Sequence, residues 1–148
     1  MLQQKIDQEI KAAMLSRNES RLRGLRAIKS ALLLARTEKG SSDVLGEETE
    51  VRVLQKLAKQ RKESAEIYQT QHREDLYQIE MEELEVIEEF LPKQLSREEI
   101  ESHVKQVIGR LGATSIKDMG KVMGAANKEL AGKADGKTIS EIVKQLLS

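Results

Sequence analysis

The chain has 148 residues, with 25 Lys or Arg against 25 Asp or Glu, so its formal net charge at neutral pH is zero. It is long enough for one or two small domains and short for a multi-domain enzyme. The absence of cysteine excludes a disulfide framework, a thiolate nucleophile and a cysteine metal site. Charged residues interrupt the first twenty positions and every later apolar run, so we expect a cytoplasmic protein without signal peptide or membrane span.

The charges are unevenly distributed along the chain. Residues 1–62 hold fourteen basic and eight acidic residues, a net charge of +6, whereas residues 63–92 hold one arginine against ten acids, a net charge of −9. Residues 93–148 hold ten basic and seven acidic residues, a net charge of +3. A polyanionic partner would meet basic surface from the two ends of the sequence and repulsion from its middle. The alternative is that the charged helix faces are simply solvated.

Helical periodicity without strand-like alternation predicts an all-α fold. The N-terminal part is expected to form helices at about residues 2–16, 20–38, 47–69 and 73–91. Asn18 or Ser20 is expected to cap the second helix, and a loop containing Gly40 and Gly46 to precede the third. The second helix carries an apolar stripe beside a basic flank, which is a candidate contact surface. That flank consists of Arg23, Arg26, Lys29 and Arg36.

Pro92, the single proline, marks the predicted boundary between an N-terminal helical bundle, residues 1–92, and a small three-helix tail domain, residues 93–148. In the tail, Ser96 and Glu99 have the spacing of a capping box.

Three tail helices are expected beyond Pro92. The first covers residues 97–111 and stops at Gly112, the second begins at Ser115 and closes at Gly132, and the third is capped by Asp135 or Thr138.

Arg61 breaks the pattern of the third helix, because it falls near the centre of the apolar stripe, where an unpaired guanidinium is costly to bury. On the next helix, Glu83 lies within the stripe and Glu80 lies on its edge. We expect the two helices to pack antiparallel, with Arg61 beside Glu83 or Glu80 in a structural pair that sets their register. The alternative interpretation is a catalytic Glu–Arg site.

Two clusters rich in glycine and lysine bracket a short amphipathic segment between residues 118 and 137. Glycine lets a backbone approach a partner closely and lysine supplies a flexible cation, so the clusters predict a surface for an anionic partner such as RNA. The candidate contact residues are Gly120, Lys121, Gly132, Lys133, Gly136 and Lys137. In the alternative, Gly132 is a helix C-cap, Gly120 makes a close helix–helix contact and the lysines are solvated.

The familiar catalytic constellations are missing. His72 and His103 lie in separate predicted elements without the spacing of a zinc site, and no phosphate loop or nucleophile elbow occurs. The acidic run between Glu82 and Glu89 is interpreted as a solvated helix face rather than a metal site. We therefore expect no catalytic residue, no metal and no cofactor. Three aromatic residues are too few for readout of single strands by base stacking.

Several sequence blocks occur in order along nearly the whole chain and together resemble the GatB/YqeY family, most closely its stand-alone YqeY-like proteins. They are LxxLRAIKSAL from Leu22, KQRKES from Lys59, REDL from Arg73, ExxE at Glu80 and Glu83, FLPxQLS from Phe90, DMGKVMG from Asp118, GKADGK from Gly132 and the closing VKQLL. The resemblance implies an all-helical protein whose tail domain is like that of the B subunit of the tRNA-dependent amidotransferase. In that enzyme the tail helps to hold the tRNA, while the amide-transfer chemistry lies in other domains.

The chain lacks the large catalytic cradle domain of the amidotransferase subunit. The resemblance therefore implies a non-catalytic module that binds tRNA or associates with a tRNA-charging or amidotransferase enzyme. In such a module Lys121, Lys133 and Lys137 would meet phosphates, and the neighbouring glycines would permit close approach. The alternatives are a protein-interaction adaptor for a synthetase or amidotransferase and, thirdly, a carbon–nitrogen ligase with glutamine as amide donor, which only the family suggests.

Overall fold

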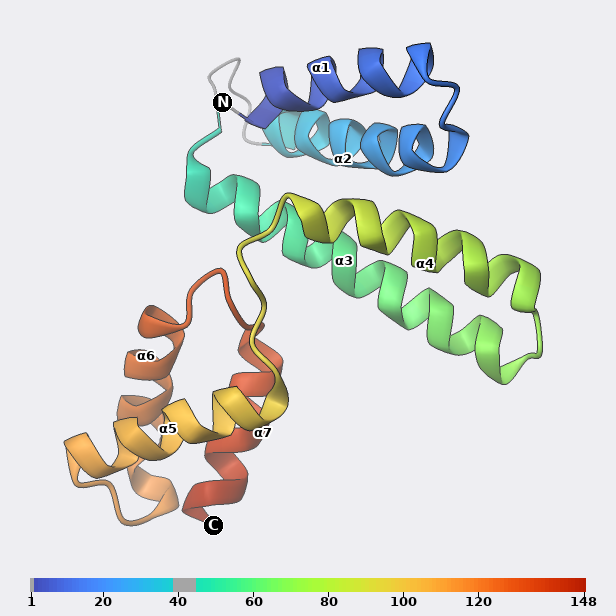
Figure 1. The fold of residues 1–148 in the computed structure, drawn as a ribbon. Coiled ribbons are helices and arrows are strands. Elements are labelled where there is room, and N and C mark those ends of the chain that lie inside the picture. The colour runs from blue at the N-terminus through green and yellow to red at the C-terminus, as the bar shows by residue number, and fades with distance from the viewer. Residues whose placement is uncertain (1, 39–44) are drawn as a thin grey trace. The chain divides into compact units, whose positions relative to one another are not determined.

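The computed structural model describes residues 2–38 and 45–148 (Figure 1). These residues form helices and no strand, which confirms the predicted all-α class. The elements are α1 (Leu2–Leu15), α2 (Glu19–Glu38), α3 (Glu47–Thr70), α4 (Glu74–Glu89), α5 (Arg97–Leu111), the short 3₁₀ helix η1 (Ile116–Asp118), α6 (Met119–Glu129) and α7 (Gly136–Leu147). The Gly40 part of the loop expected before α3 lies outside the described residues.

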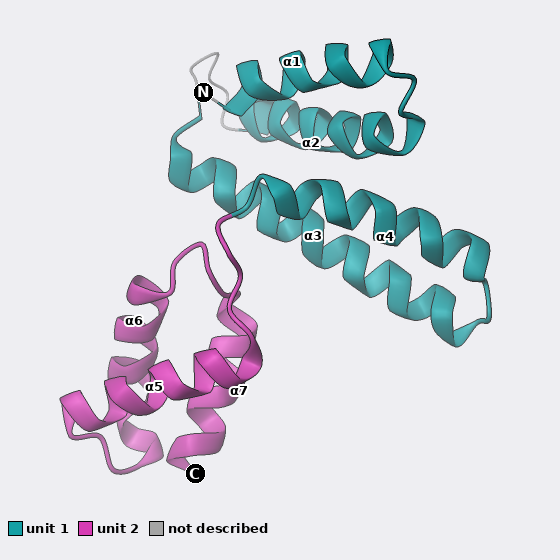
Figure 2. Ribbon diagram, in the orientation of Figure 1, with its two compact units in different colours: residues 1–91 teal, residues 92–148 magenta. Residues whose placement is uncertain are grey.

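The chain divides into two compact units, residues 1–91 and residues 92–148 (Figure 2). Each unit has its own apolar core. The first unit buries residues of α1, α2, α3 and α4, among them Ile6, Leu25, Leu32, Leu54 and Ile87. The second unit buries residues of α5, α6 and α7, among them Val104, Val107, Val122, Ile139 and Val143.

In the first unit, α3 and α4 form an antiparallel hairpin, and α2 packs across it (Figure 1). The crossing is close at Gly24 of α2, where an added Cβ would lie 2.7 Å from Cβ of Val86 in α4. The start of α2 is fixed by Asn18, whose Oδ1 accepts a hydrogen bond from the backbone N–H of Arg21 at 3.2 Å. Ser20, the other candidate cap, instead donates to Asn18.

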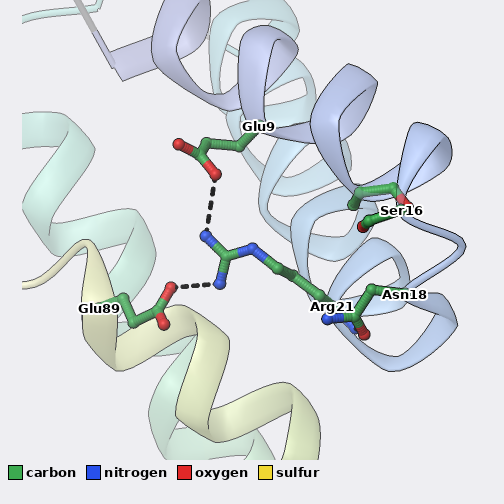
Figure 3. A network of polar contacts seen from close by, with 6 residues as sticks. Glu9, Ser16, Asn18, Arg21 and Glu89 are labelled. Atoms are coloured by element: carbon green, nitrogen blue, oxygen red, sulfur yellow. Dashed lines mark hydrogen bonds and ion pairs between the residues drawn. The ribbon is translucent and has the colours of Figure 1, made fainter.

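The basic flank of α2 is largely used inside the first unit rather than left for a partner. Arg23 pairs with Glu82 at 2.8 Å and Lys29 pairs with Asp7 at 2.8 Å. Arg21, which the prediction did not include, bridges Glu9 of α1 at 3.0 Å and Glu89 of α4 at 2.6 Å (Figure 3). Acidic residues of the neighbouring helices therefore neutralise much of the expected contact surface.

Helical periodicity places Met14 on the apolar face of α1 and Ile79 on that of α4, yet Met14 is 55% exposed and Ile79 is 37% exposed. Leu84 lies beside the apolar stripe of α4 and is buried. The periodicity of a single helix cannot show where a covering helix ends. Ile79 lies on the part of α4 that α2 does not cover.

The second unit owes its helix boundaries to local capping. Ser96 Oγ accepts from the N–H of Glu99 at 3.1 Å, and Glu99 Oε1 accepts from the N–H of Ser96 at 3.2 Å, which confirms the predicted capping box. Gly112 ends α5 with a left-handed φ of 64°. Asp135, rather than Thr138, caps α7 by accepting from the N–H of Thr138 at 2.6 Å.

The second tail helix is shorter than predicted. Its first turn, Ile116–Asp118, is 3₁₀, and α6 ends at Glu129 rather than at Gly132. Gly132 lies in the turn that follows, with a φ of 80°. Nowhere in the described ranges is a helix long and apolar enough to cross a membrane.

Candidate nucleic-acid interface

Helix α6 separates an apolar face from a face with few large side chains. Val122 and Ala126 are fully buried against α5 and α7, and Leu130 follows them into the core. The opposite face is exposed and consists of Gly120, Lys121, Gly124, Asn127 and Lys128. Since the apolar face packs on the rest of the unit, the glycine- and lysine-bearing face is directed to solvent.

Gly120 and Gly124 face open space. A Cβ built on either residue has no described atom within 4 Å outside its own stretch of helix. The alternative in which Gly120 makes a close helix–helix contact is therefore wrong. Glycine in a helix lowers stability by roughly 0.5–1 kcal/mol relative to alanine, and neither position needs glycine for packing.

The second cluster forms the turn between α6 and α7. The carbonyl of Gly132 accepts from Gln94 Nε2 at 2.8 Å, and the carbonyl of Lys133 accepts from the N–H of Leu95 at 2.9 Å. Gly132 has a left-handed φ, which glycine adopts readily, so the backbone conformation by itself explains a glycine at this position. The Lys133 side chain remains exposed on this fixed turn.

Gly136 and Lys137 form the first turn of α7, and both are exposed. The Cβ position of Gly136 lies 4.0 Å from Asn127 Oδ1, so the start of α7 is beside the outer face of α6. Lys121 lies near the opposite end of α6. At 1.5 Å per residue, Lys121 and Glu129 are about 12 Å apart along the helix axis. The predicted cations are therefore spread along the surface rather than gathered around one small anion.

The acidic residue of α6 does not neutralise these lysines. Glu129 Oε1 accepts from Arg110 Nη2 at 2.7 Å, and Glu129 Oε2 lies 3.2 Å from His103 Nε2. The hydrogen bond from Arg110, assisted by His103, lowers the pKa of the Glu129 carboxyl and keeps it ionised. Within the described residues, Lys121, Lys128, Lys133 and Lys137 make no ion pair, which leaves the surface cationic.

The interaction of Glu129 with Arg110 and His103 was not predicted from the sequence. Arg110 and His103 are seven residues apart in α5 and therefore share one helix face, which is the pattern that could have indicated a common acidic partner. The side chain of His103 is partly buried beside Glu129.

The structure also places Arg61 beside both candidate carboxylates. Arg61 Nε donates to Glu83 Oε2 at 2.7 Å, whereas Glu80 Oε2 lies 3.7 Å from the same nitrogen, beyond hydrogen-bonding distance. All three side chains are mostly buried between α3 and α4. Burial raises the pKa of the Glu80 carboxyl, an effect that Arg61 opposes and Glu83 reinforces.

A surface hollow of about 150 Å³ lies between α2 and α3, and neither Arg61 nor its two carboxylate neighbours line it. In the described ranges, no three His, Asp or Glu side chains are arranged to hold a metal ion. Arg61 and Glu83 join α3 to α4 by their hydrogen bond, and that the pair sets the register of the hairpin stays a prediction.

The fold and this surface define a class of protein: an all-helical chain of two compact units, the second of which presents uncovered glycines and unpaired lysines. The family model described as Yqey-like protein matches residues 3–147, and the chain belongs to this family. A curated relative, the E subunit of the glutamyl-tRNA(Gln) amidotransferase of Aeropyrum pernix, is 40% identical to the chain over 65 residues. The match covers 41% of this chain and 10% of the relative, so the chain spans a small part of the relative's length.

Proposed function

We propose that the chain is a non-catalytic, cytoplasmic module that binds tRNA, or associates with a tRNA-dependent enzyme, through its second unit. Membership of the Yqey-like family and the similarity to a subunit of a tRNA amidotransferase support the association with tRNA. The proposed contact surface consists of Lys121, Lys133 and Lys137, with Gly120, Gly132 and Gly136 allowing the sugar-phosphate backbone to come close.

The observation that carries the proposal is the outer face of α6. Its glycines are not required by packing, and its acidic neighbour Glu129 is held by Arg110 and His103. A cationic surface with little side-chain bulk suits a rigid polyanion, because backbone and lysines can reach phosphates together.

The mode of recognition follows from the composition of the second unit. Tyr68, Tyr77 and Phe90 all precede Pro92, so residues 92–148 contain no Phe, Tyr or Trp for stacking on bases. The surface would therefore recognise the phosphates and the shape of a folded RNA rather than the bases of a single strand.

The test is a filter-binding titration of the full chain with bulk tRNA at several salt concentrations. The variant Lys121→Ala/Lys133→Ala/Lys137→Ala is expected to bind at least about tenfold more weakly. Its salt dependence is expected to flatten by a slope of about 2 to 3, since each lost phosphate contact contributes about 0.9.

The matched control is Lys11→Ala/Lys56→Ala/Lys105→Ala, which removes the same charge from exposed positions elsewhere. Its affinity is expected to stay within about twofold of the original chain, because only the local surface is proposed to meet phosphates. Equal weakening in the two variants, or no tRNA binding at low salt, would contradict the proposal.

A second candidate is a protein-interaction adaptor that docks on a synthetase or amidotransferase through the first unit. The distal part of the α3–α4 hairpin favours it, because this part carries exposed aliphatic side chains in acidic surroundings that would repel RNA.

A further inference from the structure

The distal part of the α3–α4 hairpin, residues 62–80, extends beyond the core of the first unit. The core takes Leu54, Leu57 and Ala58 from α3 and Leu84, Val86 and Ile87 from α4, and none of its described members lies between residues 62 and 80. Figure 1 shows both helices continuing past the stretch that α2 covers. We call residues 62–80 the distal arm.

One face of the hairpin is covered by α2 along its proximal half. On α4, Glu82 pairs with Arg23, and Val86 lies against Gly24. On α3, Val53, Leu57 and Gln60 line the hollow that they share with Ala31, Leu34 and Ala35 of α2. These contacts define the face of each helix that is directed towards α2.

The same face continues uncovered into the distal arm. Ile79 precedes Glu82 by three residues and Val86 by seven, and Ile67 follows Gln60 by seven, so helical periodicity places both isoleucines on the continuation of the face under α2. Ile67 is 56% exposed and Ile79 is 37% exposed. Both are aliphatic side chains exposed on the part of the hairpin that α2 leaves uncovered.

The distal arm is acidic and its carboxylates are available. It holds five acids against Lys62 and Arg73, a net charge of −3. Arg73 is engaged with Asp75 through Nε and Nη2. Glu63 and Glu66 are exposed and pair with no cation in the described part of the chain, and Glu63 lies one helical turn from Ile67. An occupant of this surface is therefore favoured if it is cationic as well as apolar.

Helix α2 shows which occupant fits this face. It lies on the proximal half with an apolar stripe that includes Leu25 and Ile28, and with arginines that reach Glu82 and Glu89. We propose that the distal arm is a docking surface for a basic amphipathic helix of a partner protein, which lies on the continuation of the face that α2 occupies. The mode is the packing of the apolar face of an amphipathic helix against an exposed apolar face, with flanking charge pairs. It is independent of tRNA binding by the second unit.

The probe for the test is a fluorescein-labelled peptide with the sequence of residues 19–38, that is, a second copy of α2 added in trans to the full-length chain. Fluorescence anisotropy is expected to show saturable binding. The variant Ile67→Ser/Ile79→Ser is expected to weaken it at least about tenfold, as loss of central apolar anchors does in other interfaces. Both side chains are exposed, and a thermal melt checks that the variant keeps its fold.

The matched control is Leu111→Ser/Ile116→Ser, which removes two aliphatic side chains of the second unit that are 45% and 48% exposed. Its affinity for the peptide is expected to be unchanged. Hydrogen exchange of the complex is expected to show added protection within residues 62–80.

Three outcomes would overturn the proposal. The first is no binding of the peptide, and the second is binding that Ile67→Ser/Ile79→Ser does not weaken, as expected if the peptide displaces the chain's own α2. The third is a dimer in sedimentation equilibrium that this variant abolishes, because it would assign the distal arm to a second copy of the chain. None of these results bears on tRNA binding, which is measured separately.

Discussion

Helices α2 and α6 both contain glycine and cationic residues, yet the surroundings of these residues differ between the two helices. In α2, Gly24 is covered by Val86, and arginines on the helix pair with acids of α1 and α4. In α6, Gly120 and Gly124 face open space, and Lys121 has no carboxylate partner in the described residues. The first glycine serves the fold, whereas the second pair leaves a surface free for a partner.

The comparison shows that net charge is a poor guide to which cations of this chain remain without an acidic partner. Residues 1–62 are the most basic block of the sequence, at +6, but much of that charge is consumed by ion pairs within the first unit. The second unit carries a smaller excess of +3. Arg97, Lys105 and Arg110 pair with acids of this unit. Its other described lysines, among them Lys121, Lys133 and Lys137, make no ion pair with a described residue. What matters is whether the fold has already neutralised the cations.

The largest expected change in the free energy of unfolding is at Gly24, the glycine that Val86 covers. Gly24→Ala is expected to lower the free energy of unfolding by about 1–3 kcal/mol, because the added methyl would meet Cβ of Val86 at 2.7 Å and the crossing of α2 and α4 would have to open. Urea denaturation monitored by circular dichroism measures this change. Gly24→Ala/Val86→Ala removes the two Cγ atoms at 3.0 Å but keeps the Cβ at 2.7 Å, so it should recover little of the loss.

The next largest expected change in stability distinguishes the two carboxylates beside Arg61, those of Glu83 and Glu80. Glu83→Gln is expected to lower the free energy of unfolding by about 1–2 kcal/mol, because it removes the charged acceptor of the hydrogen bond from Arg61 Nε at 2.7 Å. Glu80→Gln is expected to raise it at pH 7, since burial makes the charged form of Glu80 unfavourable in the folded state. Equal losses in the two variants would show that Arg61 depends on both carboxylates alike.

The pH dependence of Glu80→Gln follows from the direction of the pKa shift. A raised pKa in the folded state means that the protonated carboxyl favours folding below its ordinary value of 4.5, and that this contribution is lost as the pH rises through the folded pKa. The advantage of Glu80→Gln is therefore expected at pH 7 and should vanish below about pH 4. Urea titrations at both pH values measure the difference.

The smallest expected change in stability is at Gly124, which no other described helix covers, and it is an increase rather than a loss. Gly124→Ala is expected to raise the free energy of unfolding by about 0.5–1 kcal/mol, because alanine restricts the unfolded chain and meets no described atom in the folded one. The same variant should bind tRNA more weakly if the backbone of α6 approaches phosphates. Unchanged stability would show that this face of α6 is in contact after all.

Much of the fold could be predicted from the sequence, because helical period and capping are local properties. The capping box at Ser96 and Glu99 and the cap at Asp135 depend on residues three apart, and the position of Arg61 opposite Glu83 follows from the register of one hairpin. The exposure of Ile79 could not be predicted in this way, because it depends on where α2 ends its passage across α4.

The candidate site was harder to predict from the sequence, because it also depends on how neighbouring helices pack. Gly24 and Gly120 look alike in sequence, and only the packing of neighbouring helices distinguishes a covered glycine from an open one. The clamp of Arg110 and His103 on Glu129 likewise joins residues of different helices. Sequence alone proposed the lysines, and the three-dimensional arrangement shows that they form no ion pair with a described carboxylate.

The most direct test of the central claim is a map of lysine reactivity with and without bulk tRNA, by brief acetylation and mass spectrometry of the full chain. The account predicts that tRNA protects Lys121, Lys133 and Lys137, and that exposed lysines of the first unit such as Lys11 and Lys56 react as before. Protection that is equal in both units, or confined to the first, would contradict it.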